Sequence, residues 1–325
     1  MLRFQDANHL EQILSYMEGE YESWNDAFES QWGHLNEDAY NAKIEELSFD
    51  ENKTLRDFEI LLRHNSLRTK VYIEEDTWLN NETLDLATDP ENKTAFEDDF
   101  LRTVLNNQGE IRIKDSIYIE KPYNAVPRTN PATPNAAIFF RIKATETTLL
   151  QTIRSKSLLI GKDFTSSVRD GTGFLYGKAT IIGNTFYTEG VEKSAKFNCI
   201  PWKRNARILP YENGNKAYKI VASLRSYFFV PRIAAKTVSY KKSNGKWKRL
   251  STRLIASFSG ILYDNNCSLS TPIPPRRKEK YRKRVGVNIN GNFGSIILQV
   301  VNSKNPYDID SYHYCNGQQQ IWGVH

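Results

Sequence analysis

Two stretches of this chain combine cationic and aromatic side chains in a spacing that suits binding rather than bond breaking. The first is a predicted β-hairpin around Asn244-Gly245, since both residues tolerate the positive φ angles of a two-residue type I′ turn. In the register that this turn sets, Ser243 pairs with Lys246 and Tyr240 with Arg249. One face of the hairpin, here called the hairpin face, then carries Tyr240, Lys242, Trp247 and Arg249.

The second stretch runs from Arg276 to Arg284, where seven of nine residues are basic. It follows a proline-rich segment and is expected to be a loop, which is either solvated or in contact with phosphate, an acidic polysaccharide or a membrane surface. Together with the hairpin face, the residues of this stretch predicted to bind a partner are Arg276, Arg277, Lys280, Arg282, Lys283 and Arg284.

No catalytic signature accompanies these cations. The chain lacks the serine-hydrolase elbow, the His-Glu-x-x-His helix and the phosphate loop, and Gly171-Thr-Gly173 has the spacing of turn glycines. The five histidines are scattered, no Cys-x-x-Cys occurs, and Asp308 with Asp310 would supply too few ligands for calcium. We therefore predict no metal, no cofactor and no catalytic residue, although an enzyme built on dispersed residues stays open.

The three cysteines allow two interpretations. Cys199 and Cys267 flank the same predicted β-rich region and are the expected pair if a disulfide forms, which would leave Cys315 free. Three buried free cysteines fit the sequence equally well.

The net charge of +6 hides a strong partition along the chain. Residues 1–150 hold 29 acidic and 15 basic side chains, whereas residues 151–325 hold 9 acidic and 29 basic ones. Two interpretations have equal weight: the two halves attract each other across a domain contact, or the basic half attracts an external polyanion.

Periodicity predicts helices first and strands afterwards. Apolar residues recur at helical spacing over residues 8–29, 37–47 and 54–67, and residues 74–99 are acidic and rich in turn formers, which is typical of a loop. Beyond residue 135, short alternating segments separated by glycine turns favour antiparallel strands. The predicted fold is α+β: a short helical amino-terminal region followed by a predominantly antiparallel β-sandwich or barrel.

We expect three parts along the chain. Residues 1–121 form an acidic helical region that ends in a β-hairpin, residues 122–135 form a proline-rich linker, and residues 136–325 form a basic antiparallel β-domain. No apolar run approaches the ~20 residues that a membrane-spanning helix needs, so we expect no transmembrane segment. The start of the given sequence shows no signal-peptide core.

Three segments resemble uncharacterised exported or cell-surface proteins of the Bacteroidota, which are often lipoproteins. Phe100 to Tyr118 resembles their LLN-x-x-GEI-x-I-x-D-x-IY segment, Lys236 to Arg249 resembles their AKT-x-S-x-KK-x-x-G-x-W hairpin, and Leu2 to Trp24 is similar to their acidic first helix. Together the segments cover about a third of the chain. The resemblance implies a secreted or outer-membrane surface protein that is helical at its amino terminus and β-rich afterwards, and it implies no activity.

These observations favour a non-enzymatic, surface-exposed protein whose β-domain binds a glycan, another anionic envelope component or another surface protein. Aromatic rings can stack on sugar faces while Lys and Arg donate charge-assisted hydrogen bonds. Two alternatives remain: a hydrolase of envelope or dietary polysaccharide that uses carboxylates from different strands, and a nucleic-acid-binding protein. The acidic amino-terminal half and the expected extracellular location disfavour nucleic acid.

Overall fold

The structure is a computed structural model of the chain, and it belongs to the α+β class. It describes residues 1–94, 96, 98–122, 137–145, 147, 150–151, 154, 157–160, 179–182, 185–188, 203–212, 214–226, 231–263, 270–290 and 310–323. Helices dominate the first part of the chain and mostly antiparallel strands follow, as the sequence predicted. None of the described helices combines the length and the apolar character needed to cross a membrane.

Polar side chains mark where the helices begin. The side chains of Asp6, Asn36, Ser66 and Asp98 each accept a hydrogen bond from a backbone N–H in the first turn that follows, which satisfies a donor the helix itself leaves free. The helices are α1 (Ala7–Trp32), α2 (Glu37–Glu46), α3 (Lys53–Leu61), α4 (Leu67–Trp78), the 3₁₀ helix η1 (Pro90–Lys93) and α5 (Asp99–Val104).

The described strands form four sheets. The first contains β1 (Arg3–Phe4), β2 (Glu110–Ile113), β3 (Ser116–Pro122) and β4 (Ala137–Lys143), in that order. A three-stranded sheet has the order β5 (Ser157–Ile160), β7 (Thr185–Thr188), β6 (Ala179–Ile182).

Two larger sheets carry the features that concern function. The five-stranded sheet has the order β11 (Lys246–Arg249), β10 (Pro231–Ser243), β9 (Lys216–Ser226), β8 (Lys203–Tyr211), with β14 (Arg284–Asn290) also paired to β10. The four-stranded sheet has the order β13 (Ser270–Arg282), β12 (Thr252–Tyr263), β15 (Asp310–Cys315), β16 (Gln318–Gly323). The described strands close no barrel.

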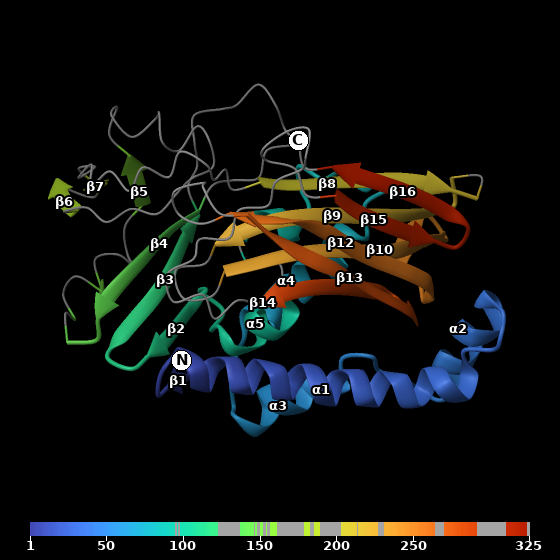
Figure 1. Ribbon diagram of the computed structural model, residues 1–325, viewed down its shortest axis with the longest axis horizontal. Helices are drawn as coiled ribbons and strands as arrows, with labels where there is room; N and C mark the ends of the chain where they lie inside the picture. The colour runs from blue at the N-terminus through green and yellow to red at the C-terminus, as the bar shows by residue number, and fades with distance from the viewer. Residues whose placement is uncertain are drawn as a thin grey trace.

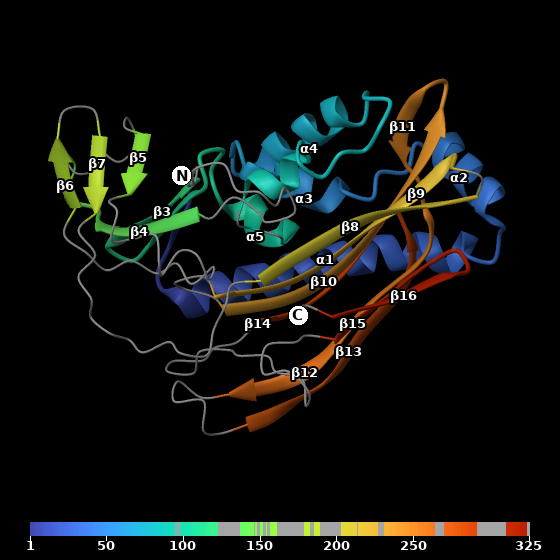
Figure 2. The same cartoon turned by 90° about the horizontal axis from the view of Figure 1, so that it is seen from above.

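The two larger sheets and the helices lie in layers. Figure 2 shows the four-stranded sheet of β12, β13, β15 and β16 on one side, the five-stranded sheet next to it, and α3, α4 and α5 beyond. From here on, the four-stranded sheet means this one. Helix α1 runs along one margin of both sheets (Figure 1). One apolar cluster joins the facing sides of the two sheets, with Tyr218 and Val285 from one sheet and Leu254 and Phe258 from the other. A second cluster joins α1, α4 and α5 to β2 through residues such as Leu10, Leu14 and Leu101.

Several local predictions are confirmed. Helix α1 covers the predicted residues 8–29, and α2 matches residues 37–47 within one residue. The hairpin of β10 and β11 has the predicted register, in which Tyr240 pairs with Arg249 and Ser243 with Lys246. Asn244 and Gly245 have φ angles of 52° and 78°, as a type I′ turn requires.

Three local predictions were wrong. The helix predicted over residues 54–67 ends at Leu61, and a new helix, α4, begins at Leu67. A loop was predicted over residues 74–99, but its first residues belong to α4. Further along, the side chains of Asp89 and Glu91 are buried, which a solvent-exposed loop would not show. The basic stretch is not a loop, since Ser270–Arg282 forms β13 and β14 begins at Arg284.

The predicted division into three parts stays a prediction, because the proposed linker lies almost wholly outside the described residues. Strand β4, which follows that linker, pairs along its length with β3, which precedes it. The first strand after the linker therefore extends the amino-terminal sheet.

Candidate functional site

The hairpin face lies against helix α4. Tyr240 is fully buried, and its hydroxyl donates to Glu75 Oε1 at 3.2 Å. Trp247 is 9% exposed, and its ring N–H donates to the backbone oxygen of Glu82 at 3.1 Å. The Tyr240 ring meets the Trp78 ring edge-on at 6.0 Å. These two aromatic residues therefore pack against the end of α4 and the segment that follows it.

The two cations of the hairpin face also contact the acidic part of the chain. The Arg249 guanidinium donates to Glu75 Oε2 at 2.9 Å and to Asp76 Oδ1 at 2.6 Å, and it lies 3.8 Å from the Tyr72 ring. Lys242 Nζ donates to the backbone oxygen of Glu82 at 3.0 Å. All four predicted residues are thus brought together, and α4 with the residues after it covers the face they form.

The basic residues of β13 lie in two different surroundings. Lys278, Lys280 and Arg282 point toward α1, where they meet the carboxylates of Glu22 and Asp26 at 2.5 to 2.8 Å. Arg276 and Arg277 are exposed. The predicted binding residues of this stretch therefore separate into a set that pairs with α1 and a set that faces solvent.

Two predicted cations lie where β13 passes into β14. The Lys283 backbone N–H donates to Glu51 Oε1 at 3.1 Å. The Arg284 guanidinium reaches Asp99 Oδ2 at 2.6 Å and Glu75 Oε2 at 3.0 Å. Lys283 thus connects the strands to the segment that precedes α3, and Arg284 connects them to α4 and α5.

A buried network of charges fills the contact between the helices and the five-stranded sheet. Lys219 Nζ is fully buried and lies 2.8 Å from Asp89 Oδ2 and 2.7 Å from Glu91 Oε2. Glu91 Oε1 also lies 2.7 Å from Lys236 Nζ and 2.9 Å from Arg102 Nη1. Each of these charges has a partner of opposite sign, as burial in a medium of low dielectric demands.

The pairing fixes the ionisation states of this network. Burial alone would raise the pKa of Glu75, but Arg249 and Arg284 lower it to about 2. Burial would likewise raise the pKa of Glu91, which Lys219 and Lys236 hold well below its ordinary value. Burial raises the pKa of Tyr240 well above its ordinary value. The carboxylates of Glu75 and Glu91 therefore stay ionised and Tyr240 stays neutral near pH 7, so none of these three groups exchanges a proton there.

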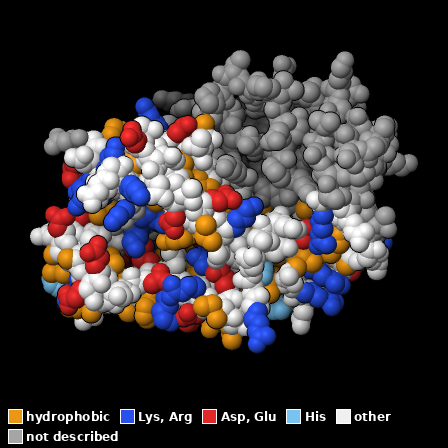
Figure 3. Space-filling view, turned by 180° about the vertical axis from the view of Figure 1, so that it is seen from behind, with side chains coloured by type: hydrophobic (Ala, Val, Ile, Leu, Met, Phe, Trp, Pro, Cys, Tyr) orange, Lys and Arg blue, Asp and Glu red, His pale blue; other side chains and the backbone are white. Residues whose placement is uncertain are grey.

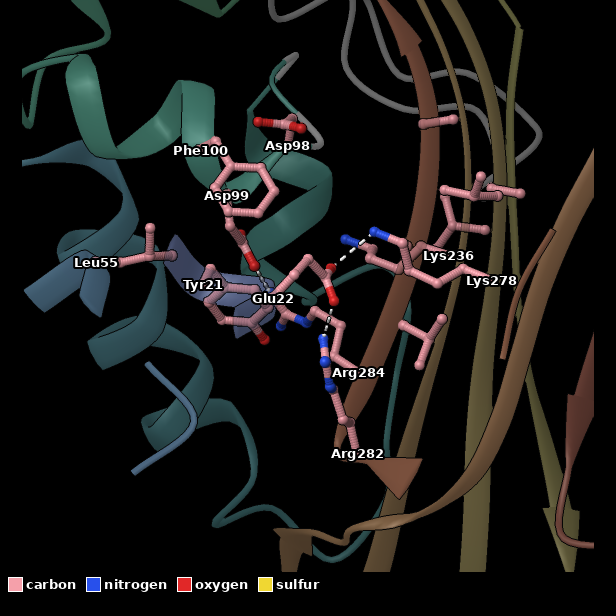
Figure 4. Close-up of a pocket in the computed structure, with 16 residues that line it drawn as sticks. Tyr21, Glu22, Leu55, Asp98, Asp99, Phe100, Lys236, Lys278, Arg282 and Arg284 are labelled. Carbon is pink, nitrogen blue, oxygen red and sulfur yellow. Dashed lines mark hydrogen bonds and ion pairs between the residues drawn. The ribbon is translucent and has the colours of Figure 1, made fainter. Parts of the chain in front are cut away.

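A small cavity lies beside this network, between α1, α5 and the strands β10, β13 and β14. Its volume is about 80 Å³, and Figure 4 shows Tyr21, Glu22, Asp99, Lys236, Arg282 and Arg284 around it. The dashed lines of Figure 4 join Glu22 and Asp99 to cations across the cavity. Because these cations have carboxylate partners, the cavity suits a few water molecules better than an anion.

The outer face of the four-stranded sheet, which we call the outer sheet face, has a different character. Register places Arg277, Ser257, Tyr312 and Ile321 in one row across the four strands. The next row contains Glu279, Ile255, Tyr314 and Gln319. Arg253, Arg277 and Ile321 are exposed, whereas both tyrosines are half-buried.

Salt bridges order the cations on the outer sheet face. Arg253 Nε donates to Glu279 Oε1 at 2.6 Å, and Arg277 Nη2 donates to Glu279 Oε2 at 2.9 Å. The Arg277 guanidinium carbon lies 5.6 Å from the centre of the Tyr312 ring. One carboxylate therefore holds two guanidinium groups beside two aromatic rings, and the group retains a positive charge.

Of this face, the sequence prediction included Arg277 alone. The signal for the rest is the spacing of Tyr312 and Tyr314, since side chains two apart on a strand share a face. The sequence does not reveal that β12 lies between β13 and β15, and that order is what brings Arg253 and Arg277 beside the tyrosines.

Comparison with known proteins identifies no family for this chain. No protein-family model matches it, and no curated protein matches it. Among solved structures, it is similar to a DUF4848 family protein from Bacteroides thetaiotaomicron, with 12% sequence identity and a TM-score of 0.19 over 100% of this chain and 96% of that one. This likeness assigns neither an activity nor a residue role to the chain.

Proposed function

We propose that the protein is a non-enzymatic binding protein whose outer sheet face takes a glycan or another acidic polymer. The observation that carries the proposal is the group of Tyr312 and Tyr314 with Arg253 and Arg277 on one solvent-facing side of a sheet. Along a strand, residues two apart lie about 7 Å from each other, so the two tyrosines can contact successive rings of an extended chain. The arginines can donate charge-assisted hydrogen bonds to its acidic groups.

Two further features belong to this proposal. The two large sheets form a sandwich, which their shared apolar cluster supports. The protein acts at the cell surface or outside the cell, which the sequence resemblance to exported Bacteroidota proteins supports. Rows of aromatic and cationic side chains along neighbouring strands suit an extended polymer of that compartment.

An array of acidic and neutral polysaccharides, probed with the full chain, tests the proposed function. Tyr314→Ala should weaken binding without changing its dependence on salt, because stacking is short-range. Arg253→Ser with Arg277→Ser should weaken binding and flatten its salt dependence, since exposed charges are screened over about 8 Å at physiological ionic strength.

Two matched controls lie away from the outer sheet face. Tyr16→Ala removes an exposed tyrosine from α1, and Lys248→Ser removes an exposed cation from β11. Both variants should bind as the wild type does. The outer sheet face would be rejected as the site if all variants bound as tightly as the wild type. It would also be rejected if the wild type itself bound no polysaccharide of the array. Release of shortened products during incubation would indicate the hydrolase instead.

A further inference from the structure

The hairpin of α3 and α4 exposes aliphatic side chains at one place on the surface. Four of the eight large hydrophobic side chains exposed in the described part of the chain lie here: Ile60, Leu61, Leu62 and Ile73, with 65%, 80%, 42% and 61% of their surface exposed. A stable isolated helical hairpin would turn such residues inward. Exposed aliphatic patches of this kind mark interaction sites more often than free surface.

Two of these side chains, those of Ile60 and Ile73, line a groove that is open to solvent. Its volume is about 760 Å³, and Ile60 and Ile73 form part of its apolar walls. That volume lies in the range of about 300 to 1,000 Å³ that ligand-binding clefts have. Figure 3 shows the face of the molecule that carries α3 and α4, on which hydrophobic and cationic side chains lie side by side. A concave surface favours an inserted segment of another molecule over a flat bilayer.

The floor of the groove is rigid and electrically balanced. Arg68 and Glu59 are both buried, and Arg68 Nε donates to Glu59 Oε1 at 3.1 Å. The Thr69 hydroxyl donates to Glu59 Oε2 at 3.0 Å. His64 Nε2 lies 3.0 Å from the backbone oxygen of Leu105, which anchors its ring to the end of α5. These contacts hold the shape of the groove before any partner arrives.

The rim adds positive charge. Arg63 is exposed and forms no ion pair among the described residues, while the exposed Arg56 pairs with the partly exposed Asp50. Arg63 has a φ angle of 48°, the left-handed conformation that glycine adopts most easily at the end of a helix. A large cation thus occupies a position where glycine would cost less strain.

We propose that this groove binds a peptide segment of a partner protein in which carboxylates flank aliphatic or aromatic side chains. The apolar side chains would cover Ile60 and Ile73, and the carboxylates would pair with Arg63 and Arg56 on the rim. The groove shares no residue with the outer sheet face, so the result of this test does not depend on whether the proposed function is correct.

The test is selection of displayed random peptides on the full chain, followed by affinity measurement with the selected peptides. The double variant Ile60→Ser, Ile73→Ser should bind them about tenfold more weakly or worse, because two aliphatic contacts are lost. Arg63→Gly should weaken binding and flatten its salt dependence while keeping the positive φ angle without strain. Leu47→Ser, which removes an exposed leucine outside the groove, should bind as the wild type does.

The expected sequences carry Asp or Glu next to Leu, Ile or Phe. The proposal is overturned if no peptide is selected, if the selected peptides lack carboxylates, or if they bind the groove variants as tightly as the wild type. Vesicles of phosphatidylglycerol provide the comparison with a membrane. Loss of vesicle binding in the groove variants, with no peptide selected, would identify the patch as a lipid contact. Melting temperatures of the Ile60→Ser, Ile73→Ser double variant and of Leu47→Ser should stay close to that of the wild type, since the replaced side chains are exposed. The melting temperature of Arg63→Gly should equal or exceed it, because glycine removes the strain of the positive φ angle.

Discussion

Acid should weaken the contact between the helices and the five-stranded sheet, and Glu75 should account for much of the effect. Its side chain is 1% exposed, and its Oε2 atom accepts from Arg249 at 2.9 Å and from Arg284 at 3.0 Å. Burial opposes its ionisation, but the two arginines lower its pKa from 4.5 to about 2. The folded protein therefore holds this carboxylate charged at pH values where the unfolded chain protonates it.

The sign and size of the effect follow from the difference between the folded and unfolded pKa values of Glu75. A carboxyl group with a lowered pKa in the folded state contributes stability above its unfolded pKa of 4.5, and the contribution disappears as pH falls toward 2. A tenfold change in a proton-binding constant corresponds to about 1.4 kcal/mol, so Glu75 contributes about 3 kcal/mol at neutral pH. The pKa of Asp99 is lowered to about 2 as well, by Arg284 and Arg102 against the effect of burial. The contributions of such close groups do not add simply, but together they are a large part of a typical stability of roughly 5 to 15 kcal/mol.

The measurement is urea unfolding at a series of pH values, with tryptophan fluorescence as the signal. The buried Trp78 at this contact contributes to that signal. The wild type should lose stability between pH 4.5 and about 2. Glu75→Gln should be less stable at neutral pH by about 3 kcal/mol or more, because two guanidinium groups lose their partner, and should lose less on acidification. Glu45→Gln, on the exposed side of α2, should keep the wild-type profile. Parallel pH profiles for Glu75→Gln and the wild type would refute the reasoning.

Two substitutions and two measurements on the cysteines test other parts of the protein. Leu14→Ala should lower the free energy of unfolding by about 2 to 5 kcal/mol in urea, because Leu14 is 2% exposed in the first core cluster. Gly245→Ala should cost about 1 kcal/mol in the same assay, since its φ angle is 78°. Burial raises the pKa of the Cys315 thiol to about 12, so an alkylating reagent should modify it only after denaturant is added. Cys199 and Cys267 lie outside the described residues, and their pairing stays a prediction that non-reducing peptide mapping of protein from an oxidising compartment would reject by finding three free thiols.

Features that depend on neighbouring residues were predictable from the sequence. The turn at Asn244-Gly245 fixes the register of the hairpin because the turn type permits one pairing only. The long apolar stripe of α1 identifies a helix whether or not its partners are known. The hairpin register also places Tyr240 and Trp247 on one face. What covers that face depends on α4 and the residues after it, which lie far away in the sequence.

Features that depend on distant charges were not predictable. Helix α4 does not stand out in the sequence because part of its buried surface is charged, with Arg68 and Glu75 turned inward, and periodicity counts such residues as exposed. Glu75 is acceptable there because Arg249 and Arg284 meet it from positions more than 170 residues later in the chain. The sequence predicted a loop for the basic stretch for the same reason, since the partners of Lys278 and Arg282 lie on α1.

The division of charge between the two halves of the chain also decides how an effect of salt on ligand affinity can be told from an effect on the stability of the fold. Many cations of the carboxyl-terminal half already have carboxylate partners from the amino-terminal half, so the net charge of that half overstates what a ligand would meet. Salt screens exposed pairs such as Arg253 with Glu279 over about 8 Å, whereas the buried pair of Glu75 and Arg249 is largely shielded from it. If the outer sheet face binds an acidic polymer as we propose, raising the salt concentration should weaken that binding well before it destabilises the contact between the helices and the sheets. A melting temperature that falls in step with affinity as salt rises would place the binding cations in the internal contact instead.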